Sequence, residues 1–364
     1  MSDVKILTLL GTRPELIRLS RIIPKLDSLC THTLVHTGQN YDERLNNIFF
    51  LEMKIRHPDI FLGMKTGDFG EQIGYMFQKV EAVLLQKMPE KVLILGDTNT
   101  GLCTIVCERM GIPVYHLEAG NRCFDKRVPE EINRKVIDSI ASYNLPYTTL
   151  SKENLLRDGV SKSRIFVVGN PIFEVLEHYS SDIERSQVLK HLKVAPEKYF
   201  LATFHRAENV DDHQTLKQIV GGLSLVASHY KMPVICSVHP RTMEKIKKWT
   251  VQAEDPGVRF CEPFGLFDFV KLEENAKCII SDSGTVAEEA CILGIPNVII
   301  RKSTERPEVL ECGSNILSGT NCGDILRCTQ VMCEMDNTCE PPDEYLIKDV
   351  SDRVVKILLG RNSL

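Results

Sequence analysis

Residues 114–134 read VYHLEAGNRCFDKRVPEEINR, and this stretch decides how the first half of the chain folds. A short run of β-branched and aromatic residues stops at Gly120, which predicts a buried strand with His116 in its interior and Glu118 at its end. Pro129 suits the first position of a helix, because its φ is fixed and it has no N–H to donate. We therefore expect a strand, a polar loop and a helix.

The expected helix has two faces. Glu130 and Arg134 are four residues apart, so they share one face. The apolar stripe that we expect to pack against the domain consists of Ile132, Val136 and Ile140. On this interpretation the carboxylate and the guanidinium are left facing a cleft.

The chain of 364 residues is long enough for two domains of about 150 to 200 residues each. Short apolar runs alternate with helical patterns throughout, which predicts parallel sheets whose ligands lie at the carboxyl ends of the strands. The charged segment that follows residue 171 lacks a strong strand. We therefore place one α/β domain at residues 1–171 and a second at 172–344, and expect residues 350–359 to form a helix packed on one of them.

The composition narrows the class of protein. A net charge of −5 gives no general attraction to nucleic acid or to an anionic membrane, so neither is expected as a partner. The thirteen cysteines are scattered and lack the paired spacing of a zinc site, which favours reduced thiols and no metal. The N-terminal apolar run is too short for a signal peptide and no segment is long enough to span a bilayer, so we expect a cytoplasmic protein.

Two turns have the features of an anion site. The apolar run of residues 4–10 ends in a glycine and leads into a helix that carries Arg13 and Arg18. Backbone N–H groups and the helix dipole favour an anion there, although a solvated first turn of an ordinary strand-helix unit fits this motif equally well. Ser283-Gly284 follows another buried strand and is the second candidate, since glycine lets the backbone approach a phosphate.

Acidic residues and one histidine stand at strand ends. Asp97 alone would most simply cap a helix, but Glu118 ends a neighbouring strand and Glu130 opens the next helix, which favours a shared site. His205 follows an apolar strand, where a structural role and a catalytic role are equally compatible with the sequence. Glu289 lies one turn into its helix, where it would accept from ribose hydroxyls or merely interact with the helix dipole.

These groups suit one kind of ligand better than others. Arginines and helix ends favour a diphosphate, and carboxylates favour proton transfer or the stabilisation of a cationic sugar. The sequence has no dinucleotide glycine fingerprint and no lysine-centred phosphate loop. A bound hydride carrier and a nucleoside triphosphatase are therefore not expected.

Six motifs, taken in order over nearly the whole chain, closely resemble those of the non-hydrolysing UDP-N-acetylglucosamine 2-epimerases. They are GTRPE at Gly11, GDT at Gly96, HLEAG at His116, RVPEEINR at Arg127, SDSGT at Ser281 and TERPE at Thr304. The resemblance implies a GT-B-type fold of two Rossmann-like domains, with UDP bound by the second and the C-terminal helix, residues 345–364, returning to the first. It also implies a homodimer, and neither a metal nor a nicotinamide cofactor.

The resemblance further implies a reaction and roles for individual residues. UDP would leave its N-acetylated amino sugar to give an enzyme-held 2-acetamidoglycal, and would re-add after the proton at carbon 2 returns on the other face. The catalytic group would be Asp97, Glu118, Glu130 and His205. The diphosphate would be held by Arg13, Arg18, Ser283, Gly284 and Arg306, and the ribose by Glu289, with Arg134 supporting the site.

The loop at residues 120–131, GNRCFDKRVPEE, resembles one branch of that family. This branch epimerises UDP-linked 6-deoxy N-acetylated L-sugars, as in the formation of UDP-N-acetyl-L-fucosamine, and supplies precursors of surface polysaccharides. A GT-B glycosyltransferase that uses a UDP-sugar and a non-catalytic UDP-sugar sensor are the alternatives. Three acidic residues favour the epimerase, because a transferase has less need for three.

Overall fold

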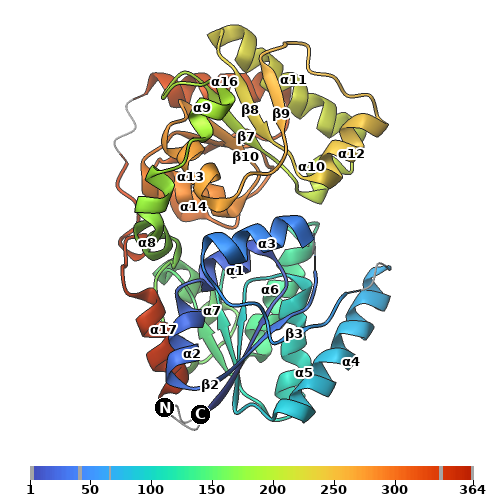
Figure 1. The fold of residues 1–364 in the computed structure, drawn as a ribbon, viewed down its shortest axis with the longest axis vertical. Coiled ribbons are helices and arrows are strands. Elements are labelled where there is room, and N and C mark those ends of the chain that lie inside the picture. Colours follow the sequence, from blue (N-terminus) through green and yellow to red (C-terminus); the bar gives the residue numbers. More distant parts are fainter. Residues whose placement is uncertain (1–3, 40–42, 65–66, 336–338, 362–364) are drawn as a thin grey trace. The chain divides into compact units, whose positions relative to one another are not determined.

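The computed structural model describes residues 4–39, 43–64, 67–335 and 339–361, and the chain divides into two compact units (Figure 1). The first unit comprises Met1–Glu177 and Asp343–Leu364, and the second comprises His178–Pro342. Each unit contains a six-stranded sheet in which neighbouring strands pair in parallel. The predicted α/β class with parallel sheets is confirmed.

The sheet of the first unit has the strand order β3-β2-β1-β4-β5-β6. Its strands are β1 (Lys5–Leu10), β2 (Thr31–His36), β3 (Ile60–Phe61), β4 (Lys91–Leu95), β5 (Val114–Leu117) and β6 (Tyr143–Leu145). Its helices are α1 (Arg13–Leu19), α2 (Ile22–Leu29), α3 (Glu43–Glu52), α4 (Phe69–Lys87), η1 (Asn99–Cys103), α5 (Thr104–Arg109), α6 (Pro129–Ile140), α7 (Thr149–Arg157), η2 (Lys162–Arg164), η3 (Asp343–Tyr345) and α17 (Val350–Leu359), and α8 (Ile172–Glu184) leads into the second unit. The central strands are continuous apolar runs because helices cover both faces of a parallel sheet.

The second unit repeats this topology with the order β12-β11-β10-β7-β8-β9. Its strands are β7 (Phe200–Thr203), β8 (Val234–Ser237), β9 (Val258–Cys261), β10 (Cys278–Ser281), β11 (Asn297–Ile299) and β12 (Asn315–Leu317). Its helices are α9 (Val188–Leu192), α10 (Ala207–Val210), α11 (His213–Tyr230), α12 (Pro240–Lys248), α13 (Leu266–Glu274), α14 (Gly284–Leu293), α15 (Pro307–Glu311) and α16 (Cys322–Glu334).

In both units the first and fourth strands are neighbours, and the strand order reverses between them. In an open parallel sheet this is the point where ligands bind, outside the carboxyl ends of the strands. The loops after β1 and β4 meet there in the first unit, and the loops after β7 and β10 meet there in the second. The topology thus identifies where the predicted site residues of each unit should gather.

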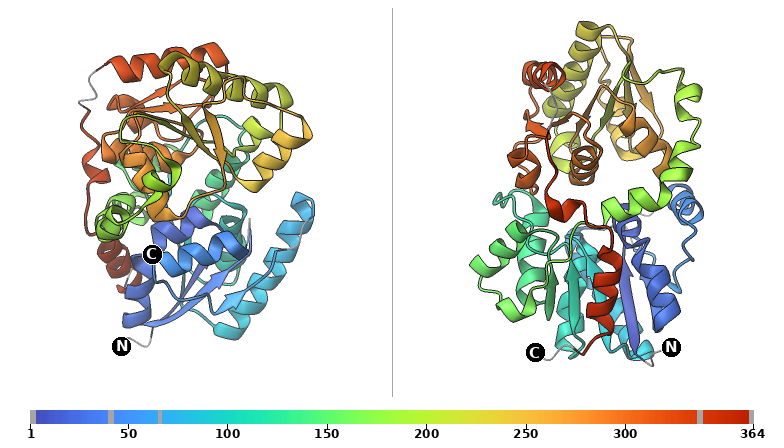
Figure 2. Two further views of the ribbon diagram at one scale, coloured as in Figure 1. Left: turned by 45° about the horizontal axis from the view of Figure 1, so that its top comes forward. Right: turned by 90° about the vertical axis from the view of Figure 1, so that its left-hand side faces the viewer.

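The C-terminal helix α17 packs against α2 within the first unit, as Figures 1 and 2 show. Lys25 on α2 contacts the carboxylate of Asp352 at 2.6 Å. Lys91, which begins β4, donates to the carbonyls of Leu358 and Gly360 at 2.5 and 2.7 Å. Lysine side chains from α2 and β4 therefore bind the two ends of α17.

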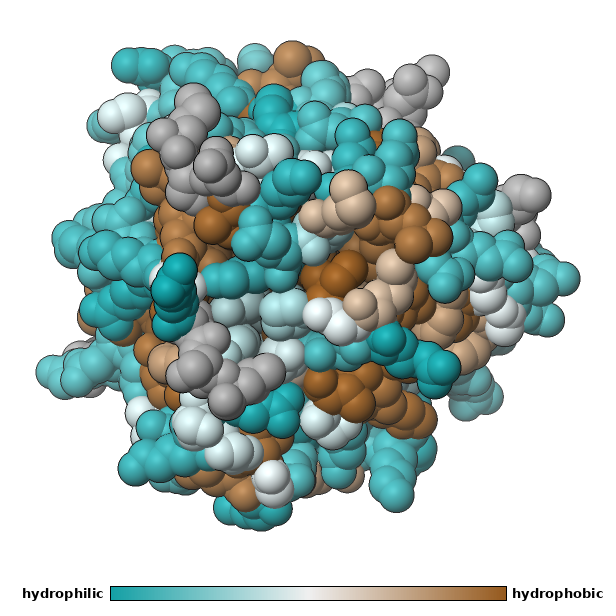
Figure 3. Space-filling view, turned by 90° about the horizontal axis from the view of Figure 1, so that it is seen from below, coloured by the Kyte–Doolittle hydropathy of each residue, from teal (hydrophilic) through white to brown (hydrophobic). Residues whose placement is uncertain are grey.

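The face drawn in Figure 3 carries polar side chains interspersed with several separate apolar patches. Within the described residues, no helix is both long and apolar enough to cross a membrane. All thirteen cysteines are free thiols, some buried in the two cores and the others partly exposed.

Candidate active site

Glu118 directly follows β5 and has a left-handed backbone conformation, with φ of 72°. Its buried carboxylate accepts a hydrogen bond from the hydroxyl of Tyr147 at 3.2 Å. The guanidinium of Arg18, on α1, lies 3.1 Å from the same oxygen. A left-handed conformation at a residue other than glycine costs free energy and is concentrated at functional sites. The structure therefore brings together two of the predicted site residues at the end of β5.

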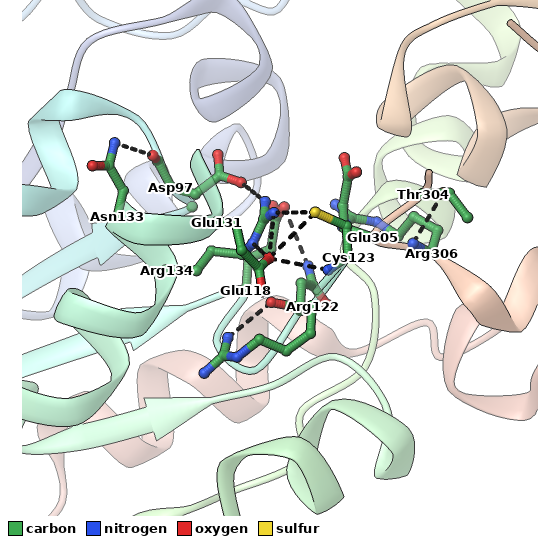
Figure 4. A network of polar contacts seen from close by, with 12 residues as sticks. Asp97, Glu118, Arg122, Cys123, Glu131, Asn133, Arg134, Thr304, Glu305 and Arg306 are labelled. Carbon is green, nitrogen blue, oxygen red and sulfur yellow. Dashed lines mark hydrogen bonds and ion pairs between the residues drawn. The ribbon is translucent and has the colours of Figure 1, made fainter. Parts of the chain in front are cut away.

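Arg134 is almost fully buried in α6 and joins two acidic residues (Figure 4). Its guanidinium contacts the carboxylate of Asp97, which follows β4, and donates to Glu131 Oε2 at 2.8 Å. Asn133 donates to the backbone carbonyl of Asp97 at 2.9 Å and so holds the same turn. Helix α6 thus fixes the predicted carboxylate Asp97 at the strand end.

The predicted orientation of α6 is wrong. Ile132 is 53% exposed, Val136 and Ile140 are only half-buried, and Arg134 is buried in ion pairs instead of being left open. The side chains that the helix buries are Glu131, Asn133, Arg134, Ile137 and Asp138. Because α6 lies over strand ends that carry charged groups, it buries side chains that can pair with those groups. The predicted site residue Glu130 lies in the same first turn and is half-buried.

Glu131 also anchors the loop that precedes α6. The backbone N–H groups of Cys123 and Phe124 donate to its carboxylate at 3.0 and 3.2 Å. Phe124 has a positive φ of 56° and a largely exposed side chain. Because a bulky residue adopts this conformation only when its surroundings enforce it, the buried carboxylate of Glu131 determines the shape of the loop.

His116 is buried in β5, as predicted, and belongs to a second charged network. Its Nε2 donates to the carbonyl of Gly96 at 2.8 Å, and its Nδ1 lies 2.8 Å from Asp138. Burial lowers the pKa of His116, but the hydrogen bond and charge of Asp138 outweigh it and raise that pKa overall. Arg122 contacts the other oxygen of Asp138 at 2.6 Å and also bonds to Asp158. The network holds the loop after β5 against α6.

The turn after β1 does not present an open anion cradle. The carboxylate of Glu15, on α1, accepts from the backbone N–H groups of Gly11 at 2.5 Å and Thr12 at 3.2 Å. These are the groups that the sequence suggested for a phosphate, so the turn is closed by the chain itself. Arg13, on the same helix, is half-buried with its guanidinium over the ring of Phe49.

In the second unit, His205 follows β7 and is held by a buried carboxylate at the end of β10. Asp282 accepts from the backbone N–H groups of His205 and Arg206 at 3.1 and 3.0 Å and from the amide of Asn209 at 2.9 Å. His205 Nδ1 lies 3.6 Å from the same carboxylate, and its side chain is half exposed. Asp282 therefore sets the turn that presents the imidazole.

The remaining predicted residues of the second unit gather around the start of α14. Ser283 caps this helix by accepting from the N–H of Val286 at 3.4 Å. A Cβ atom added to Gly284 would lie 2.9 Å from Glu305 and 3.9 Å from the guanidinium carbon of Arg306, so the backbone approaches these side chains closely. Further along α14, Glu288 forms an ion pair with Arg306, which precedes α15. The next residue, Glu289, is almost fully buried.

A family model described as UDP-N-acetylglucosamine 2-epimerase matches residues 25–359. The chain belongs to this family. The epimerase of Methanocaldococcus jannaschii is 39% identical over 98% of this chain and 99% of that protein, and its structure in complex with UDP-GlcNAc and UDP has a TM-score of 0.93.

Two further likenesses show the breadth of the family. The structure of the UDP-N-acetylglucosamine 2-epimerase of Rickettsia bellii is 38% identical, covers 98% of this chain and 96% of that chain, and has a TM-score of 0.90. The UDP-2,3-diacetamido-2,3-dideoxy-D-glucuronate 2-epimerase of Pseudomonas aeruginosa is 32% identical over 87% of this chain and 88% of that protein. The predicted GT-B-type fold is confirmed, and the chain is an enzyme of the UDP-N-acetylglucosamine 2-epimerase type.

The buried carboxylates to which the sequence-based prediction gave no role include Glu131, Glu15 and Asp282. Glu131 lies three residues before Arg134, a spacing that pairs side chains on a helix as well as the four-residue spacing does. Glu15 lies three residues after Thr12, which is the spacing of a capping box. Asp282 bonds to residues more than seventy positions away and has no short-range signal. The part of the chain that the structure describes contains no group of three histidine, cysteine or acidic side chains suited to a metal ion.

Proposed function

We propose that this protein inverts carbon 2 of a UDP-linked N-acetylated hexosamine without hydrolysing the nucleotide sugar. The observation that carries the proposal is the group of charges at the ends of β4 and β5, where Arg134 joins Asp97 to Glu131 and Arg18 pairs with Glu118. Carboxylates held in a partly dry site stabilise positive charge on a sugar and transfer protons efficiently.

The reaction needs such carboxylates because carbon 2 is too weakly acidic to lose its proton directly. Cleavage of the bond between carbon 1 and UDP first leaves positive charge on the sugar, which Asp97, Glu118 and Glu130 stabilise. Loss of the proton from carbon 2 to one of these carboxylates then gives the double bond of a 2-acetamidoglycal. Return of a proton to the other face and of UDP to carbon 1 gives the epimer, with His205 completing the catalytic group.

Residues for binding the nucleotide are assigned in each unit. Arg13 and Arg18, together with Ser283, Gly284 and Arg306, hold the diphosphate, and Glu289 accepts from the ribose hydroxyls. The close approach of backbone and arginine at Gly284 supports this assignment, since a diphosphate needs both. Arg134 supports the site by holding Asp97.

For the sugar we propose either UDP-N-acetylglucosamine, giving UDP-N-acetylmannosamine, or the 6-deoxy N-acetylated L-hexosamine equivalent, giving UDP-N-acetyl-L-fucosamine or quinovosamine. The names of the Methanocaldococcus jannaschii and Rickettsia bellii relatives support the first, and the loop at residues 120–131 supports the second. The Pseudomonas aeruginosa relative acts, by its name, on a differently substituted sugar. We further propose that the enzyme acts in the cytoplasm as a homodimer and supplies precursors of surface polysaccharides.

Proton NMR in heavy water tests the proposal, with each UDP-sugar as substrate. Loss of the carbon 2 proton signal and growth of the epimer, without free sugar, is the expected result. Asp97→Asn and Glu118→Gln should stop this exchange and leave UDP-sugar binding intact. Transfer of the sugar to an added acceptor would instead indicate a glycosyltransferase, and saturable binding with no exchange on any donor would indicate a sensor.

A further inference from the structure

Glu15 connects two turns of the first unit that lie side by side at the carboxyl edge of the sheet. One carboxylate oxygen accepts from the N–H groups of Gly11 at 2.5 Å and Thr12 at 3.2 Å, in the turn after β1. The other oxygen accepts from the hydroxyl of Thr98 at 2.7 Å, in the turn after β4. The side chain is only 2% exposed, so these bonds are shielded from water.

We propose that Glu15 is a positioning residue for the epimerase reaction: by joining the β1 turn to the β4 turn, it fixes the helix that carries Arg13 and Arg18 relative to the turn that carries Asp97. This inference rests on the proposed function, because it assumes that those three side chains act on one substrate. Arg13 and Arg18 lie on the helix that the first turn starts, and Asp97 directly precedes Thr98. A shift of either turn therefore moves a proposed diphosphate ligand relative to a proposed catalytic carboxylate.

An ordinary helix cap does not account for all of these contacts. In a capping box the carboxylate accepts from the N–H of the capping residue, which here is Thr12. The bonds to Gly11 and Thr98 are additional, and the bond to Thr98 crosses from one strand end to the next. A carboxylate that only capped α1 would not need the hydrogen bond from Thr98.

The connection depends on the protonation state of Glu15. Burial, assisted by the negative charge of Asp97, raises the pKa of the Glu15 carboxyl to about 7, although the three hydrogen bonds lower it. The ionisable group that acts on it is Asp97 from the β4 turn, while Arg18, on the same helix as Glu15, is paired with Glu118 at the end of β5. The ionised carboxylate accepts from all three donors, whereas a proton on Oε1 would reverse the direction of the Thr98 bond and weaken the bonds from Gly11 and Thr12, because they would lose their charge assistance.

The experiment measures exchange at carbon 2 and the affinity for UDP-N-acetylglucosamine, whose diphosphate does not titrate in this range, across about one pH unit on either side of 7. In the wild type we expect both to fall as the pH drops through the pKa of Glu15. Thr98→Val removes one hydrogen bond to the carboxylate and should move this midpoint to higher pH. Thr98→Ser retains the hydroxyl and should keep the wild-type midpoint, which makes it the matched control.

Glu15→Gln should remove the part of the pH dependence that Thr98→Val shifts and lower the exchange rate roughly 100-fold, as expected for a small misplacement of reacting groups. A merely structural Glu15 would lower the melting temperature of these variants without moving the midpoint. Equal midpoints for wild type and Thr98→Val would overturn the proposal. If no donor shows exchange at any pH, the proposed reaction fails, and the pH profile of binding still decides the role of Glu15.

Discussion

Replacing Asp138 with asparagine should destabilise the first unit by about 3–5 kcal/mol, the usual cost of breaking a buried ion pair from one side. Asp138 is 1% exposed and accepts from His116 at 2.8 Å, from Arg122 at 2.6 Å and from the N–H of Gly120 at 3.1 Å. Both charged partners are equally buried, so solvent does not screen the loss. Asparagine would leave the buried His116 without its counter-ion and would leave Arg122 with only the partly exposed Asp158.

Thermal unfolding followed by circular dichroism measures this effect. In a domain of about 150–250 residues each kcal/mol shifts Tm by roughly 2–4 °C, so a shift of about 6–20 °C is expected. Asp158→Asn is the matched control, because Asp158 bonds to the same Arg122 but its side chain is 37% exposed. That variant should lose less than about 1 kcal/mol. If Asp138→Asn and Asp158→Asn both lost the same small amount of stability, the reasoning would be refuted.

The pH dependence of the same pair gives a second measurement. Burial raises the pKa of Asp138, but its hydrogen bonds and the charges of His116 and Arg122 outweigh this and lower it from 3.8. That stabilisation is present above pH 3.8 and is lost as the pH falls through the folded-state pKa. The raised pKa of His116 adds stabilisation that is complete below 6.5 and is lost as the pH rises. The difference in stability between the wild type and Asp138→Asn should therefore be largest between pH 3.8 and pH 6.5.

Three further changes can be tested on the same material. Glu130→Gln should reduce carbon 2 exchange by a factor of about 10²–10⁴ with little change in UDP affinity, and wild-type turnover would remove Glu130 from the site. Gly284→Ala should destabilise the second unit by about 1–3 kcal/mol, since its Cβ would lie 2.9 Å from a buried carboxylate oxygen of Glu305 that two arginines hold; an unchanged Tm would contradict this. Burial and then the charge of Glu289 raise the pKa of Glu273, so its ionisation costs the folded state free energy. Glu273→Gln should therefore become progressively more stable than the wild type as the pH rises above 4.5. Parallel curves of Tm against pH for the two proteins would contradict this.

The inner strands of both sheets and the residues at their ends could be predicted because those signals are local, whereas the short edge strands β3, β6, β9 and β12 were not predicted. An apolar run ending in glycine is enough to place Asp97 and Glu118 at the edge of the sheet. The orientation of α6 could not be predicted, because hydrophobic periodicity assumes an apolar neighbour and this helix faces charges instead. Ile132 lies outward and Glu131 inward for that reason. The choice between Glu130 and Glu131 as the partner of Arg134 depends on where Asp97 stands, which only the sheet determines.

The same reasoning explains why the roles of the buried carboxylates Asp282 and Glu15 were not predicted. The partners of Asp282 and Glu15 lie on other strand ends, so these pairs exist only once β10 lies beside β7 and β4 beside β1. Ionising Glu15 in its buried position costs free energy that a neutral side chain of similar shape would avoid. The bonds from Gly11 and Thr12 account for the start of α1, but the bond from Thr98 joins two turns that carry proposed site residues. That additional bond is what a contribution to positioning the catalytic groups requires.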